Sequence, residues 1–185
     1  TGGHCERVPT LTMMLAEAVN NCRVGPLSNF TMSDRDRYEL RIAGLLHDCG
    51  KVTTPVHVVD KATKLQTIYD RIDLIDTRFE VVKRDAEITA LRGGMDAAGL
   101  KKLLEDIDDD RDFLRRANVG GEAMNDADIN RVREIAARYR WRGPDGGERD
   151  FLSSDEVENL TIRAGTLTAS ERQIINHHIE VTIQM

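Results

Sequence analysis

The spacing of apolar residues over two long stretches, joined by Gly93-Gly94, limits the fold more than any other feature of the sequence. In residues 67–91, and again in residues 96–117, apolar side chains recur every three or four positions, as on one face of an α-helix. Two helices of this length, separated by a short glycine turn, indicate an antiparallel hairpin. Other stretches have the same spacing, and no strand-rich region or repeat is present. The sequence therefore predicts an all-α fold.

Local signals predict where two helices of the first third begin and end. Residues 8–19 have helical spacing, and Pro9 suits the first turn of such a helix. Ser33 is a good N-cap, because its side chain can accept a hydrogen bond from an unpaired backbone N–H. We expect that helix to run to Cys49, with Gly50 as its C-cap.

Composition indicates a soluble globular chain and excludes several classes of protein. The chain has 185 residues, of which 40% are hydrophobic, so it can bury a core. A net charge of −6 argues against binding to a nucleic-acid polymer. The three cysteines form no C-x-x-C pair, which favours reduced thiols and a cytoplasmic location. No apolar run approaches the ~18 residues of a membrane span, so we expect no membrane contact.

The adjacent pair His47-Asp48 lies at the end of an apolar run, so we expect it in the last turn of a largely buried helix. A buried carboxylate without a partner costs several kcal/mol, so Asp48 needs a cation. Lys51 is three residues on, at the spacing of a salt bridge within a helix. A metal ion is the other choice, and these residues alone leave the two readings open.

Two further histidines favour the metal. His4 begins the first helix, and His178 lies on the last one, about on the same face as Glu171. Three helices would then each bring an imidazole to one place, where Asp48 can bridge two metals. Imidazole and carboxylate ligands suit Fe, Mn, Zn or Ni. Such a centre holds a water as hydroxide and clamps a phosphoryl group during in-line attack.

Motifs from both ends of the chain, read in order, resemble those of the HD-GYP family, a branch of the HD-domain metal-dependent phosphohydrolases. The pattern H-D-x-G-K is typical of the HD superfamily, and the later L-T-x-x-E-R followed by a histidine narrows the resemblance to HD-GYP. The resemblance implies an HD-domain-like helical bundle. It is carried by His4-Cys-Glu-Arg7-Val8, Ala43-Gly-Leu-Leu-His47-Asp48-Cys-Gly50-Lys51, Pro55, Asp60-Lys61-Ala-Thr-Lys-Leu65, Gly165-Thr-Leu167-Thr168-Ala-Ser-Glu171-Arg172 and His178-Ile-Glu-Val-Thr182.

The resemblance implies a role for each of five residues. His4, His47 and Asp48 would hold one metal. Asp48 would bridge to a second metal, to which His178 contributes. Lys51 would face the scissile phosphate, neutralising its charge or passing a proton to it, so Lys51 and Asp48 are the expected catalytic residues. The expected cofactors are divalent transition metals in a two-metal site.

Of the adjacent histidines near the C-terminus, His178 is the expected ligand. Its distance to Thr182 fits the family's H-x-x-x-T spacing. His177 would then point elsewhere on the helix, as a solvated residue or one that only supports the site.

The chain departs from the family pattern in two ways. The family runs from the K-x-x-x-L segment directly into the L-T-x-x-E helix, whereas Leu65 and Leu167 here bracket a long insertion. We therefore expect residues 1–65 to be the N-terminal part of the core, 66–164 a helical insertion and 165–185 a core helix. The insertion would serve as a lid, a dimerisation arm or a partner surface. The family's G-Y-P loop and later ligands are not in this sequence, so we expect a fragment that carries about half of the ligand set.

These observations together predict a metal-dependent phosphodiesterase of HD-GYP type. The resemblance implies cyclic di-GMP as substrate, hydrolysed by metal-hydroxide attack, and a fragment of such an enzyme can be inactive by itself. One alternative is a catalytically inactive HD-type signalling or protein-interaction module. Another is an HD phosphohydrolase that acts on a different nucleotide.

Overall fold

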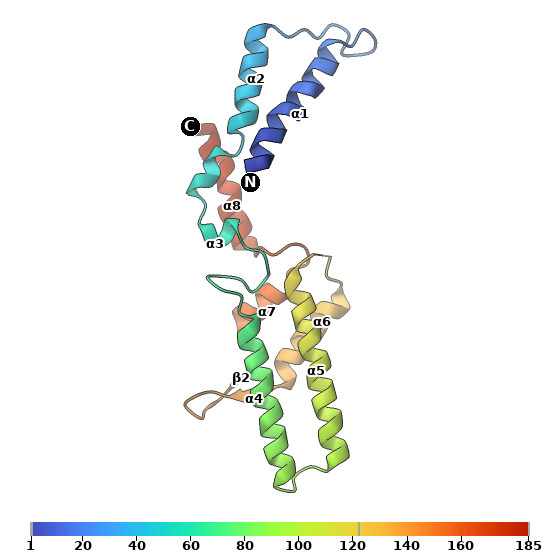
Figure 1. Ribbon diagram of the computed structural model, residues 1–185, viewed down its shortest axis with the longest axis vertical. Coiled ribbons are helices and arrows are strands. Elements are labelled where there is room, and N and C mark those ends of the chain that lie inside the picture. Colours follow the sequence, from blue (N-terminus) through green and yellow to red (C-terminus); the bar gives the residue numbers. More distant parts are fainter. Residues whose placement is uncertain (1, 122, 185) are drawn as a thin grey trace. The chain divides into compact units, whose positions relative to one another are not determined.

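The computed structural model describes residues 2–121 and 123–184 and confirms the all-α class. The described residues divide into two compact units: the part up to Pro55 together with the part from Gln173 onward, and Val56–Arg172. Figure 1 shows the elements and labels most of them. They run in the order α1 (Gly2–Asn20), α2 (Asp34–Leu46), the 3-10 helix η1 (Cys49–Thr53), α3 (Val56–Val59), α4 (Ile72–Leu91), α5 (Ala97–Val119), α6 (Asp126–Arg138), β1 (Arg140–Arg142), β2 (Glu148–Asp150), α7 (Ser154–Leu160) and α8 (Ala169–Gln184).

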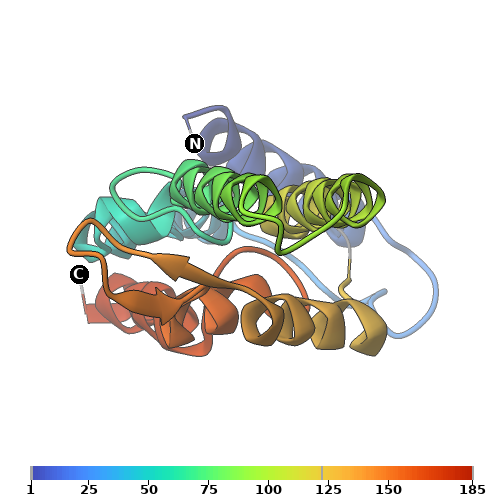
Figure 2. The same ribbon diagram turned by 90° about the horizontal axis from the view of Figure 1, so that it is seen from below.

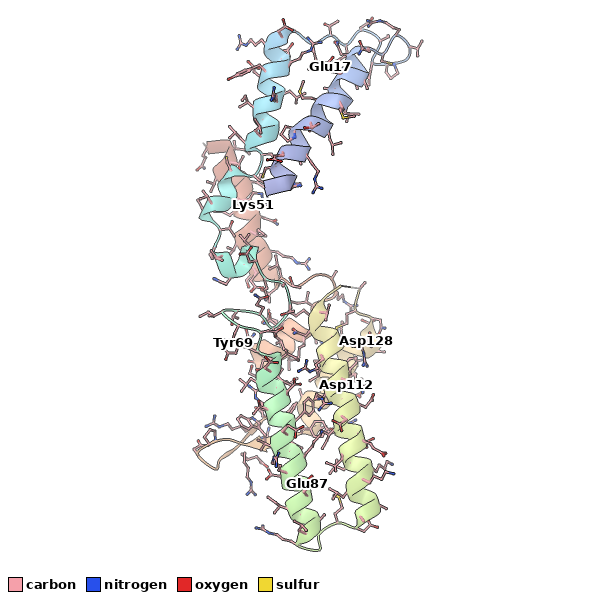
Figure 3. The ribbon with its side chains drawn as sticks, in the orientation of Figure 1. Glu17, Lys51, Tyr69, Glu87, Asp112 and Asp128 are labelled. Atoms are coloured by element: carbon pink, nitrogen blue, oxygen red, sulfur yellow. The ribbon has the colours of Figure 1, made fainter. Side chains whose placement is uncertain are left out.

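In the first unit, α1 and α2 pack side by side (Figure 1). Glu17, labelled on α1 in Figure 3, accepts a 2.6 Å hydrogen bond from Arg37 of α2. The prediction that Pro9 lies in a first turn is wrong, because α1 begins at Gly2 and Pro9 is inside it. A Cβ on Gly44 of α2 would lie 3.1 Å from the Pro9 Cα. We attribute the tolerance of an interior proline to this close packing, which offsets part of its cost.

The start of α2 was predicted correctly and its end was not. Ser33 caps the helix, and its side chain accepts from the Asp36 N–H in a capping box. The helix ends at Leu46 instead of Cys49, with His47 as its C-cap, so His47 and Asp48 follow the helix. Among its residues Gly44 alone is buried, so α2 is not the largely buried helix that we expected.

Gly50 is not a helix C-cap. It lies within η1, and its backbone φ is not positive, so it does not serve the left-handed turn for which glycine is usual. Its Cα instead faces α8, where an added Cβ would lie 2.1 Å from the backbone oxygen of His178. Glycine is needed there for close approach of two backbones.

The second unit contains the predicted hairpin of long helices, α4 and α5, which lie side by side in Figure 1. Helix α4 begins at Ile72, later than the expected residue 67. Asp96 caps α5, accepting from the Gly99 N–H, and Gly120 ends it with a left-handed φ of 71°. These signals were readable in sequence because they are local.

The hydrophobic core of the second unit forms where α4, α5, α6 and α7 meet. At its centre Phe79, Tyr139 and Phe151 contact one another, with ring centroids 4.4 to 5.8 Å apart. Buried Asp110 accepts hydrogen bonds from Arg138 and from the Tyr139 hydroxyl, which ties α5 to the end of α6. Strands β1 and β2 pair antiparallel as a short hairpin, seen as two arrows in Figure 2.

The two units differ in how much apolar surface they bury. Every large apolar side chain that is buried in the described part of the chain belongs to the second unit, between Val58 and Leu160. The buried described residues of the first unit are Pro9, Gly44, Gly50 and Thr54. Within the described residues, no helix has the length and apolar character to cross a membrane.

Candidate metal centre

The first unit brings together residues from four separate elements. His4 comes from the first turn of α1, His47 from the end of α2, and Asp48 from the turn before η1. Each offers a ligand atom, and these three atoms all lie within 4.8 Å of one another. His178 of α8 approaches the same carboxylate from the other side, with Nε2 3.5 Å from Asp48 Oδ1. All four ligands expected from the sequence are therefore neighbours.

The spacing of the donor atoms suits one divalent ion. His47 Nε2 lies 3.3 Å from His4 Nε2 and 3.3 Å from Asp48 Oδ2, and His4 Nε2 lies 3.8 Å from that oxygen. Ligands at about 2.1 Å from a metal are themselves about 3.0 to 3.4 Å apart in tetrahedral or octahedral coordination. Two of the separations match this range, and His4 is close to it. Two imidazoles and a carboxylate also form a donor set that suits transition metals.

Backbone hydrogen bonds fix which nitrogen two of the histidines present. His47 Nδ1 lies 2.7 Å from the Gly44 carbonyl oxygen, and His178 Nδ1 hydrogen-bonds to the carbonyl of Ile175. Because a carbonyl oxygen only accepts, each Nδ1 carries the proton, and in the neutral ring Nε2 keeps its lone pair. Both Nε2 atoms face Asp48, so the rings are held in the tautomer that binds a metal.

The electrostatics of the group centre on Asp48, whose side chain is 16% exposed. Burial raises the pKa of this carboxyl, but the hydrogen bond and charge of Lys51, with His47 and His178, outweigh burial and lower the pKa overall. Asp48 is therefore ionised at neutral pH. Its two oxygens face different neighbours, Oδ2 toward His4 and His47 and Oδ1 toward His178.

Lys51 supplies the salt bridge that the sequence offered as the alternative to a metal. Its Nζ donates to Asp48 Oδ2 at 2.7 Å, and the side chain is 36% exposed. In Figure 3 it projects from the segment that follows α2. The oxygen that Lys51 binds is also the one nearest the two imidazoles, so a cation in this group would compete with Lys51 for it. The salt bridge with Lys51 and the coordination of a metal ion therefore describe the same site, without and with a bound metal.

Gly50 and Thr182 hold α8 against η1, a role that the sequence did not reveal. The Gly50 N–H donates to Thr182 Oγ1 at 3.0 Å. The absence of a Cβ at Gly50 allows the backbone oxygen of His178 to approach. Thr182 follows His178 by one helical turn, so this contact sets the position of the His178 ring. The H-x-x-x-T spacing was the only sequence signal for it.

The adjacent histidines have different surroundings. The His178 side chain is 13% exposed and faces Asp48, whereas that of His177 is 62% exposed and lies 2.9 Å from Glu180. The structure therefore places His178, and not His177, beside the carboxylate.

Two other residues of the sequence motifs meet in the second unit. The Lys61 ammonium donates to both oxygens of Glu171, at 2.9 and 2.8 Å, and to Asn159 Oδ1 at 2.9 Å. Glu171 also accepts from the Thr168 N–H at 2.8 Å, and its own N–H donates to Thr168 Oγ1 at 3.2 Å, so the two residues form a capping box. This network fixes the start of α8, and no role for Lys61 in it was expected from the sequence.

Comparison with known families is consistent with this geometry. The family model of the HD domain matches residues 1–117, which is more than half of the chain. The chain therefore belongs to the HD domain family, whose members are in general metal-dependent phosphohydrolases that bind divalent metals. The match runs through α4 and most of α5. No curated protein and no solved structure gives a significant match.

Proposed function

We propose that the protein is a phosphodiesterase of HD-GYP type that hydrolyses cyclic di-GMP, with His4, His47, Asp48 and His178 as metal ligands. The observation that carries the proposal is the convergence of these side chains, with both oxygens of Asp48 facing imidazole nitrogens. Membership of the HD domain family supports the metal-dependent phosphohydrolase class. The choice of cyclic di-GMP rests on the L-T-x-x-E-R motif and its histidine.

The donor set divides between two sides of Asp48, which supports two ions that share this carboxylate. His4 and His47 would hold one ion with Oδ2, and His178 would contribute to the second at Oδ1. Bound divalent metals supply a water of lowered pKa and positive charge against a phosphoryl group. The Nδ1 hydrogen bonds of His47 and His178 keep their rings oriented for this task.

Lys51 would serve the substrate directly. It is the one lysine of the first unit, and its ammonium lies beside Asp48 with a partly exposed side chain. Once a metal takes over the charge of Asp48, the ammonium is free to bind a phosphate oxygen. It would neutralise charge on the scissile phosphate or pass a proton to it.

The test is hydrolysis of cyclic di-GMP by the whole chain in the presence of Mn²⁺ or Fe²⁺, with products separated by chromatography. We expect Asp48→Ala to lose more than about 100-fold in rate. Lys51→Ala should lose activity while retaining metal, since it is not a ligand. His177→Ala, which removes an exposed imidazole one residue from His178, should stay within about twofold of the unmodified protein.

Equal hydrolysis by the unmodified chain and by Asp48→Ala would contradict the mechanism. If the chain binds metal through these residues but cleaves a different nucleotide, the proposed metal centre stands and the proposed substrate is wrong.

A further inference from the structure

The second unit buries a lysine that neither the fold nor the proposed function explains. Lys64 is 2% exposed, among the largest fully buried side chains of the chain. Its ammonium donates to the Leu160 carbonyl oxygen at 3.1 Å and approaches the sulfur of Met124 at 3.7 Å. Both are neutral acceptors. Among the described residues, no carboxylate forms an ion pair with it.

An ammonium in this position is costly. Taking a charge out of water costs several kcal/mol unless an opposite charge accompanies it. Burial accordingly lowers the pKa of Lys64, and the charge of Asp128 opposes this only in part. The Leu160 carbonyl belongs to the last residue of α7, where the helix end is partly negative. That partial charge is smaller than a full counter-ion.

The lysine lines a cavity of about 440 Å³ in the second unit. This volume is within the range of small-molecule sites, which are about 300 to 1,000 Å³. Phe113 and Met124 give the cavity an apolar wall, and Asp128, labelled on α6 in Figure 3, also lines it. The cavity thus combines a buried cation with apolar surface.

A second cation faces the same cavity. Arg116, in the last turn of α5, lines it and has no ion pair with any described residue. Arg131 also lines the cavity, but Asp109 and Asp110 already bind its guanidinium. Among the described residues that line the cavity, Lys64 and Arg116 therefore provide two positive charges against the single carboxylate of Asp128. The charge carried by these described lining residues is positive.

We infer that this cavity binds a phosphate group carried by a small molecule, with Lys64 and Arg116 as its cationic contacts. The planar guanidinium of Arg116 suits two phosphate oxygens, and the ammonium acts as a point charge. The rest of the ligand would lie against Phe113 and Met124. This site is built entirely from the second unit and does not depend on the metal centre.

The experiment is calorimetric titration of the whole chain with inorganic phosphate and, separately, with glycerol 3-phosphate. A chelator keeps the candidate metal centre from contributing. We expect both probes to bind, the ester more tightly. Lys64→Met and Arg116→Gln should each weaken binding at least about tenfold, as expected for loss of a hydrogen bond to a charged group.

Two variants serve as controls. Arg133→Gln removes the same charge from an exposed position of α6 that does not line the cavity, and affinity should change less than about twofold. Because Arg116 is exposed, Arg116→Gln tests the site even where Lys64→Met does not fold. Glu122 lies outside the described residues. The Glu122→Gln variant therefore tests, in the same titration, whether this carboxylate is the counter-ion of Lys64.

The proposal is overturned by three results. The first is no binding of either probe to the unmodified chain at concentrations up to about 10 mM, which corresponds to a free energy weaker than about −3 kcal/mol. The second is binding that Arg116→Gln and Lys64→Met leave unchanged. The third is binding that occurs only in Glu122→Gln, which would make Lys64 part of an internal ion pair.

Discussion

At the scale of single residues, the surroundings of Asp48 determine what the candidate centre does. Its Oδ2 lies beside the His47 imidazole and the Lys51 ammonium, and its Oδ1 lies beside the His178 imidazole. The proximity of His47, Asp48 and Lys51 was readable from the H-D-x-G-K pattern, because those residues are adjacent in sequence. The approach of His4 and His178 depends on tertiary packing. From the sequence, this approach could be predicted only from the positions of the two histidines on their helices and from the family resemblance.

Substitution of Gly50 tests the close contact between η1 and α8. In Gly50→Ala the new Cβ would lie 2.1 Å from the His178 oxygen and 2.8 Å from the Thr182 nitrogen. Both atoms are backbone, so α8 must shift. We expect the free energy of unfolding to fall by about 1 to 3 kcal/mol, the range for overpacking, as measured by urea denaturation.

Gly3→Ala is the matched control in the same unit. Apart from its own chain neighbours and the nearby backbone of α1, no described atom lies within 4 Å of the position of its Cβ. Alanine there should be neutral or stabilise by up to about 1 kcal/mol. Equal loss of stability in both variants would show that the contact with α8 does not exist.

The Thr182 hydroxyl gives a finer test of how His178 is positioned. Thr182→Val keeps the shape but removes the acceptor of the Gly50 N–H, whereas Thr182→Ser keeps the hydroxyl. We expect Thr182→Val to weaken Mn²⁺ binding about tenfold in calorimetric titration. Thr182→Ser should restore most of the affinity. If valine and serine behave alike, the hydrogen bond has no part in placing the ligand.

At the scale of elements, the helices that local signals define were predictable. The apolar stripes and glycines of the α4–α5 hairpin lie within one stretch of chain. The caps Ser33 and Asp96 are each adjacent in sequence to the helix that they cap. The predictions that were wrong concern residues whose structural role depends on contact with an element that is distant in sequence. Pro9 is accommodated inside α1 by packing on Gly44, and Gly50 is required by the approach of α8. Neither constraint is present in the local sequence.

The contact between α4 and α7 should make the second unit sensitive to acid. Burial raises the pKa of Glu156, but the hydrogen bonds of Arg78 and Ser153 and the charge of Arg78 outweigh it, so the pKa lies below the usual 4.5. A carboxyl with a lowered folded-state pKa stabilises above its unfolded pKa, and this contribution is lost as pH falls through the folded value. We expect stability of this unit to decline below pH 4.5.

The measurement is urea denaturation at pH 7 and near pH 3, on the unmodified chain and on Glu156→Gln. The variant should be less stable at pH 7, because Arg78 loses its charged partner, and should change less between the two pH values. Glu158→Gln, on the same helix, controls for a general charge effect. A pH dependence unchanged by Glu156→Gln would refute the role of this pair.

At the scale of the whole molecule, the two units should differ in local stability. The large buried apolar side chains of the described chain all belong to Val56–Arg172. Local opening costs less where few apolar contacts are lost. We therefore expect backbone amides of α4 and α5 to exchange with solvent much more slowly than those of α1 and α2, as measured by hydrogen exchange. Similar protection in all four helices would contradict this.

Metal binding should act on one unit only. A ligand that binds only the folded form stabilises it by RT ln(1 + L/Kd), where L is the free ligand concentration. Mn²⁺ should therefore slow amide exchange around His4, His47 and His178 and leave α4 and α5 unchanged. Slower exchange confined to α4 and α5 would place the cation elsewhere.

The most direct measurement is the metal content of the purified chain after incubation with Mn²⁺ or Fe²⁺ and removal of free ions. Convergence of His4, His47, Asp48 and His178 predicts bound metal in the unmodified chain and in His177→Ala, and its loss in Asp48→Ala. Equal metal in the unmodified chain and in Asp48→Ala, with both folded, would contradict the claim that this carboxylate stands at the centre of a metal site.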